Sequence, residues 1–111
     1  MSIEKVSRDR WESWCDRVSK ELGAALVEIE VAGLDVGDQI EAEWVPLIGI
    51  SYDPREEVLS VETEVLEHLI RNPVELLAEQ ETDGLRSITV VDREEHRQVI
   101  RLRKPLALPE P

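Results

Sequence analysis

The sequence predicts an α+β fold, in which an N-terminal amphipathic helix is followed by a mostly antiparallel sheet or a small barrel of five to seven strands. Residues 7–22 carry apolar side chains at helical spacing, whereas much of 25–103 alternates apolar and polar residues, as half-buried strands do. The chain has 111 residues, of which 41% are hydrophobic, enough for one domain with its own core. We therefore expect a single domain over 1–111, with a flexible start at 1–6 and an extended tail at 104–111.

The predicted helix, 7–22, has one apolar face. Its apolar side chains recur three or four positions apart: Trp11, Trp14, Cys15, Val18 and Leu22. Ser7 suits the N-cap, and Gly23 suits the end of the helix. We expect this face to pack on the sheet, although two tryptophans on one stripe also fit a partner surface. We interpret Cys15 as a buried small side chain, because the sequence shows no base or electropositive setting that would activate a thiol.

The stretch from Ala24 to Trp44 is predicted to form an antiparallel hairpin. Apolar and acidic residues alternate in both arms, and the linker GLDVGD supplies glycines and aspartates that favour turns. The simplest register pairs Ala32 with Gln39 and sets Glu30 opposite Glu41. Like charges in this position destabilise a sheet by about 0.2–1 kcal/mol per pair. An offset register, good solvation or a neighbouring basic strand would relieve the repulsion.

The next stretch predicts a bent strand, a turn and a further strand. Pro46 cannot donate a hydrogen bond to a ladder and therefore marks a bend, a bulge or an edge. Alternation continues to Tyr52, so the second arm of the hairpin can be one long bent strand. The sequence DPRE at 53–56 predicts a turn, and the alternation at 59–63 predicts another strand.

Residues 65–83 leave two alternatives open. The sequence NPVE looks like a helix start, with Asn72 as the cap, Pro73 in the first position and Glu75 closing a capping box. Apolar residues at alternate positions also fit a strand: Val74, Leu76 and Ala78. The pattern alone favours the helix slightly.

The end of the chain predicts a second hairpin. Its arms are Leu85–Asp92 and Arg97–Arg103, joined by the polar loop REEH. Arg101 and Arg103 share one face of the last arm. If this arm flanks the acidic strand of the first hairpin, the two rows of charge neutralise each other.

The tail KPLALPEP contains three prolines, which favour extended backbone. Leu106 and Leu108 in this tail need cover from water. They either pack on the protein's own surface or form a docking strip for another subunit or a partner protein.

Charge is distributed unevenly along the chain. The net charge is −12; residues 25–83 hold sixteen acids and two arginines, whereas residues 84–111 hold four acids and six bases. A field of this sign repels nucleic acid and anionic lipid, so we expect no nucleic-acid or membrane partner. The acidic stretch is either a solvated face or a surface for a basic partner.

The sequence indicates a cytoplasmic protein. One cysteine excludes an internal disulfide, the N-terminus has no apolar core like that of a signal peptide, and no apolar run approaches a membrane span.

Four segments together resemble a small bacterial family of unknown function that ends in a PLxLP-type tail: PLIGISYDPREEVLSV, HLIRNPVEL, GLRSITVVD and RQVIRLRKPLALP. The resemblance runs from about Trp11 to Pro109. It implies a compact α+β domain of a bacterial cytoplasmic protein, and it favours a strand at 73–80. No catalytic or binding residues are known in that family that the resemblance would transfer.

No motif in the sequence predicts a catalytic, metal or cofactor site, so enzymatic activity is not expected, although the sequence does not decide it. His68 and His96 lie far apart in the sequence, and no HxxxH or CxxC motif accompanies them. The phosphate-binding patterns GxGxxG and GxxxxGK[ST] and the GxSxG nucleophile elbow are also absent.

We therefore expect a non-enzymatic interaction or assembly module that forms homo-oligomers or binds a protein partner. The candidate partner-binding residues are Arg101, Arg103, Leu106 and Leu108. One alternative is a small-molecule-binding or catalytic domain that uses a carboxylate cluster with Tyr52 or Trp44. A second is an Sm-like or SH3-like barrel that binds nucleic acid, which would need a basic groove of four residues: Arg97, Arg101, Arg103 and Lys104.

Overall fold

The computed structural model describes residues 2–35 and 37–108. Within these ranges the chain forms eight strands, one α-helix and one short 3-10 helix. In chain order they are β1 (Ser2–Lys5), the 3-10 helix (Arg8–Arg10), α1 (Trp11–Lys20), β2 (Leu26–Gly33), β3 (Gly37–Asp53), β4 (Val58–Thr63), β5 (Glu67–Arg71), β6 (Pro73–Glu81), β7 (Gly84–Asp92) and β8 (Arg97–Leu106).

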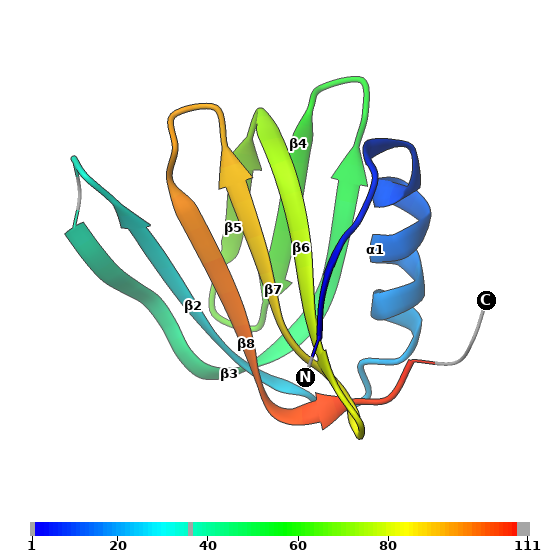
Figure 1. Ribbon diagram of the computed structural model, residues 1–111. Helices are drawn as coiled ribbons and strands as arrows, with labels where there is room; N and C mark the ends of the chain where they lie inside the picture. The colour runs from blue at the N-terminus through cyan, green and yellow to red at the C-terminus, as the bar shows by residue number, and fades with distance from the viewer. Residues whose placement is uncertain (1, 36, 109–111) are drawn as a thin grey trace.

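The strands form one antiparallel sheet in the order β1-β6-β7-β8-β2-β3-β4-β5. The sheet curls on itself, with α1 along one side, but β1 and β5 remain its unpaired edges (Figure 1). The α+β class is confirmed, while the sheet is open rather than a closed barrel. The expected count of five to seven strands is wrong by at least one, because Ser2–Lys5 pair with β6 where we expected a flexible start.

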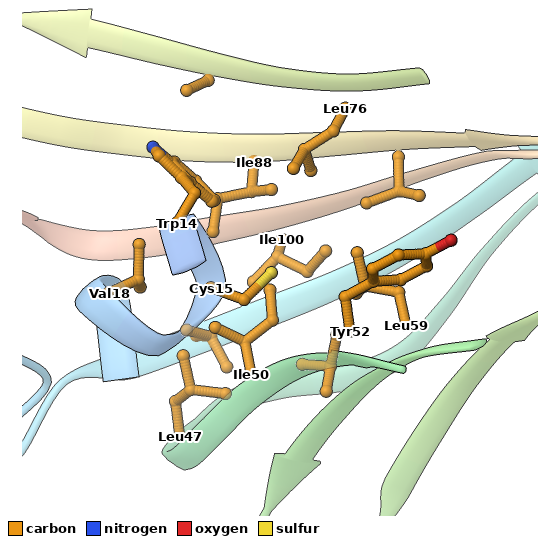
Figure 2. Close-up of a cluster of buried hydrophobic side chains, with 14 of the residues drawn as sticks. Trp14, Cys15, Val18, Leu47, Ile50, Tyr52, Leu59, Leu76, Ile88 and Ile100 are labelled. Carbon is orange, nitrogen blue, oxygen red and sulfur yellow. The ribbon is translucent and has the colours of Figure 1, made fainter. Parts of the chain in front are cut away.

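The helix buries its apolar stripe against the sheet, as predicted (Figure 2). The Trp11 indole N–H donates to the Val6 carbonyl oxygen at 2.8 Å, and its ring meets Tyr52 edge-on with 5.2 Å between ring centroids. The Ser19 hydroxyl donates to the backbone oxygen of Ile50 on β3, 2.7 Å away, and accepts from the Ile50 N–H at 2.9 Å. Cys15 is fully buried, as predicted, and this burial raises the pKa of its thiol to about 12.

Residues Pro73–Glu81 form strand β6, so the slight preference for a helix was wrong and the strand favoured by the family resemblance is confirmed. The strand pairs with β1 on one side and β7 on the other, and it buries Leu76 and Ala78 completely. Asn72 is not a helix cap. It adopts a positive φ of 53°, donates its N–H to the Glu57 oxygen and accepts from the Arg93 N–H. Pairing with β7 along most of the strand and with β1 over residues 77–80, together with the burial of Leu76 and Ala78, outweighs the local capping signal.

The register of the first hairpin differs by one residue from the simplest prediction. Gln39 lies opposite Val31, and Glu30 lies opposite Ile40 rather than Glu41. The offset begins at the turn, where Gly33 lies opposite Gly37, and it separates Glu30 from Glu41 before the two irregularities further along β2. An offset register is one of the three forms of relief that the sequence predicted. The long bent strand predicted across Pro46 is confirmed as β3.

Candidate functional site

Arg101 on β8 binds both acidic residues that face it from β2. It lies in register with Glu28, and its Nη1 atom is 3.1 Å from a Glu28 Oε1 atom and 2.7 Å from Oε1 of Glu30. The hydrogen bond to Glu30 is the main cause that raises the pKa of Arg101, and partial burial opposes it. The predicted neutralisation of the acidic row by β8 is therefore confirmed for Arg101.

Arg103, two residues further along β8, does not take part in this ion-pair cluster. Its guanidinium carbon lies 5.6 Å from the centroid of the Trp44 ring, within the range of a cation–π contact. Trp44 has a positive φ of 49°, which is unusual for a bulky side chain. The predicted neutralisation thus holds for Arg101 and not for Arg103.

Near its end, β8 loses its pairing with β2 and is out of register with β7 between Arg101 and Leu106. Its last residue in register with β2 is Leu102, and its register with β7 jumps from Ser87–Arg101 to Leu85–Leu106. A hollow of about 520 Å³ opens where the strands part. We call it the β8 fork, and its walls are Leu22, Ala24, Ala25, Leu26, Arg103, Lys104, Pro105 and Leu106.

The β8 fork combines apolar walls with two exposed cations. Apart from Arg103 and Lys104, all its lining side chains are leucine, alanine or proline. Neither cation forms an ion pair with an acidic residue in the described ranges. In a chain of net charge −12, two unneutralised cations beside an apolar hollow are suited to an apolar group that carries a carboxylate nearby.

Leu106 and Leu108 are half-buried and pack against the protein's own core. Leu106 lies opposite Leu85 on β7, and its backbone passes close to Gly84: a Cβ added to this glycine would lie 2.5 Å from the Leu106 oxygen. Both leucines thus have cover within the chain. Their role in binding a partner stays a prediction.

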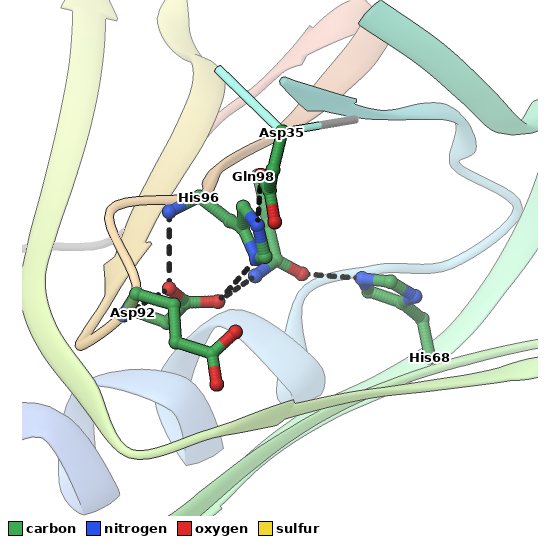
Figure 3. Close-up of polar contacts among 6 residues, drawn as sticks. Asp35, His68, Asp92, His96 and Gln98 are labelled. Carbon is green, nitrogen blue, oxygen red and sulfur yellow. Dashed lines mark hydrogen bonds and ion pairs between the residues drawn. The ribbon is translucent and has the colours of Figure 1, made fainter. Parts of the chain in front are cut away.

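At the other end of β8, the structure gathers a polar network that the sequence did not predict (Figure 3). His96 Nε2 lies 2.7 Å from Oδ1 of Asp35 in the β2–β3 turn, and His96 Nδ1 lies 3.4 Å from Asp92. Gln98, which is 5% exposed, donates to Asp92 Oδ2 at 3.0 Å, and its Oε1 atom is 2.5 Å from Nε2 of His68. We call these five residues the histidine network.

The histidine network fixes loops rather than presenting a reactive group. Asp92 Oδ1 accepts from the backbone N–H groups of Glu94 (2.9 Å) and His96 (3.0 Å), which shapes the β7–β8 loop. The hydrogen bond to the Asp35 carboxylate is the main cause that raises the pKa of His96; desolvation opposes it, and the charges of Asp35, Asp92 and Glu94 raise the pKa further. His96 thus joins the β7–β8 loop to the β2–β3 turn. The sequence signal that could have predicted this loop structure is Asp92, because an aspartate just before a polar loop often caps a turn.

The two alternative functions find less support in the geometry. Tyr52 is buried against Trp11 and is not accessible to a ligand, while Trp44 lies half-buried under Arg103. Arg97 is six residues from Arg103, about 20 Å along β8 at ~3.3 Å per residue. With Arg101 held by its two glutamates, the four bases do not gather into one groove.

The described residues hold no group of three or more histidine, cysteine or acidic side chains arranged to bind a metal ion. In the same part of the chain, every helix is too short or too polar to cross a membrane.

Comparison with known proteins places the chain in a family. The model of a family of unknown function, DUF5335, matches residues 2–111. An uncharacterized protein of Aquifex aeolicus (strain VF5) is 38% identical over 111 residues, which cover 99% of this chain and all of that protein. No solved structure matches the chain. The resemblance predicted from the sequence segments is confirmed as a family, while its PLxLP-type tail stays a prediction: the chain belongs to the DUF5335 family of unknown function.

Proposed function

We propose that the protein is a non-enzymatic interaction module that assembles with further copies of itself through the β8 fork. The observation that supports this most directly is the pair Arg103 and Lys104, two exposed cations without an acidic partner in the described residues, beside an apolar hollow. A second copy offers the complementary charge, because its residues 25–83 hold sixteen acids and two arginines. Complementary charge speeds such encounters and sets their register.

The net charge of each copy opposes association, whereas ion pairs at the fork favour it. The distance over which each acts decides which is stronger in salt. The shortest dimension of the molecule is 26 Å, so the centres of two touching copies lie well beyond the Debye length of about 8 Å at ~0.15 M salt. Screening at this ionic strength removes most of the overall repulsion, whereas ion pairs at contact distance persist. Raising the salt to ~1 M, with a Debye length of about 3 Å, should then weaken the assembly.

Light scattering across a concentration series tests the proposal with the double variant R103E/K104E. We expect the wild-type mass to rise with concentration and to fall again at high salt. The variant should stay monomeric under the same conditions, because the fork then carries two negative charges.

A matched control separates the fork from net charge. The double variant R55E/R93E changes the chain from −12 to −16, as R103E/K104E does, but at two exposed positions outside the fork. It should assemble like the wild type at ~0.15 M salt, where the overall field is screened. The proposal fails if the wild type is monomeric at every concentration and salt, or if the two double variants behave alike.

A further inference from the structure

We infer that Leu34 of a second copy, at the tip of the β2–β3 hairpin, enters the β8 fork as an apolar knob. This inference rests on the proposed function and names the residue that the fork receives. It follows from two surfaces of the same molecule whose chemistry matches.

Leu34 is the most exposed large hydrophobic side chain of the described residues. Its relative exposure is 105%, whereas the next values are 66% for Ile3 and 65% for Val65. Leu34 lies in the turn at the tip of the β2–β3 hairpin, which projects from the body of the sheet and lies far from the end of β8 (Figure 1). A single exposed leucine is common on proteins. A fully exposed one at the tip of a projecting, acidic hairpin is a candidate anchor.

The knob and the fork are both apolar, and the charged residues beside them have opposite signs. Leucine side chains line the fork, and its volume of about 520 Å³ leaves ample room for one further leucine side chain. Beside the knob, Asp38 is exposed at the start of β3, and it can face Arg103 or Lys104 when Leu34 enters the hollow. Apolar burial and charge pairing would then form in one contact.

The knob is also held in place before binding. Asp35, next to Leu34, lies 2.7 Å from His96, so the residue beside the knob is tied to the β7–β8 loop. A side chain that is presented by a constrained turn loses less conformational freedom on binding than one on a loose loop.

The geometry requires a head-to-tail assembly. Knob and fork are different surfaces, so each copy can give one knob and receive another, and the contacts close into a ring or extend as a filament. One leucine and one or two ion pairs make a small interface, which gives weak, concentration-dependent association rather than a permanent oligomer.

The test uses two monomeric variants that complement each other. L34S keeps the fork and lacks the knob, whereas R103E/K104E keeps the knob and lacks the fork. Each alone should associate at least about tenfold more weakly than the wild type, since leucine burial is lost in one and the cations in the other. Mixed in equal amounts, they should form a species of twice the 12.7 kDa chain mass and nothing larger, because the mixture allows one productive contact per pair.

Val65→Ser is the matched control, since Val65 is an exposed apolar residue in a different turn, between β4 and β5, and should leave the mass unchanged. If R103E/K104E prevents assembly while L34S assembles like the wild type, the proposed function stands and the Leu34 inference is wrong. If the mixture contains only monomers, the head-to-tail contact is wrong. If the wild type never assembles, the proposed function and this inference both fail.

Discussion

The two ends of β8 differ in whether their polar side chains are paired. At the loop end, Asp92 accepts hydrogen bonds from the Gln98 amide and from the backbone N–H groups of Glu94 and His96, and the His96 ring lies 3.4 Å from it. At the fork end, Arg103 and Lys104 meet no acidic partner in the described residues and flank an apolar hollow. Buried polar groups that are fully paired stabilise one conformation, whereas exposed unpaired charges contribute little to folding and remain available for binding. We therefore expect substitutions at the loop end to change stability and substitutions at the fork end to change association.

Asp92→Ala should have the largest effect on stability. It removes the acceptor for two backbone N–H groups and for the Gln98 amide, and the Asp92 side chain is only 12% exposed. We expect the free energy of unfolding, measured by urea denaturation, to fall by about 3 kcal/mol, because two partly buried donors and one exposed donor lose their shared acceptor. Asp92→Asn, which keeps an acceptor oxygen, should lose clearly less. An Asp92→Ala variant as stable as the wild type would show that the histidine network does not hold the loop.

Arg101→Glu should have the next largest effect, and Arg103→Glu is its neighbour control. The first change places a third carboxylate beside Glu28 and Glu30, whereas the second removes only the contact with Trp44. Arg101 is 43% exposed, so solvent screens part of the loss, and we expect a decrease of about 2 kcal/mol in the free energy of unfolding. Arg103→Glu should cost less than about 1 kcal/mol. Equal losses in the two variants would contradict the distinction between the ion-pair cluster and the fork.

The elements that sequence patterns predicted correctly are those whose apolar side chains recur at the spacing of a strand or a helix and so share one buried face. The two hairpins, the long bent strand and the helix stripe all show this periodicity. For strand β6 the local pattern slightly favoured a helix because of NPVE, whereas the family resemblance favoured the strand that pairing with β1 and β7 produces. Strand β1 has four residues, too few for a period to emerge, and its partner lies more than seventy residues away.

The candidate site was predictable in part for the same reason. Alternation placed Arg101 and Arg103 on one face, and the acidic row on β2 suggested a partner for them; the structure confirms this for Arg101. The β8 fork lies between the end of β8 and residues 22–26, which are far apart in the chain, so no local pattern encodes it. The histidine network joins His96 to Asp35 and Gln98 to His68, residues 61 and 30 positions apart in the chain. Contacts of that range follow from strand order, which the sequence alone did not settle.

The smallest effect that we expect is a dependence of stability on pH. It connects His96, at the loop end of β8, with the residues beside Leu34. The pKa of His96 is raised, first by its hydrogen bond with Asp35 and then by the charges of Asp35, Asp92 and Glu94. A folded-state pKa above the unfolded value of about 6.5 means that the protonated form stabilises the fold. This contribution is fully present below about pH 6.5 and is lost as the pH rises through the folded-state pKa.

An NMR titration of the His96 ring should therefore give a pKa above that of an unfolded histidine, and His96→Asn removes the titrating group. The stability difference between wild type and His96→Asn, from urea denaturation, should be largest near about pH 5.5 and shrink towards pH ~8.5.

Because Asp35 is the neighbour of Leu34 in the same turn, amide hydrogen exchange in the β2–β3 turn should accelerate over that pH range in the wild type. In the variant it should stay nearly constant after correction for the intrinsic rate. A stability difference that grows with pH would reverse the sign of the linkage. Unchanged exchange in the turn would mean that His96 stabilises its own loop without constraining the knob, and the loop end and the fork end of β8 would then act independently.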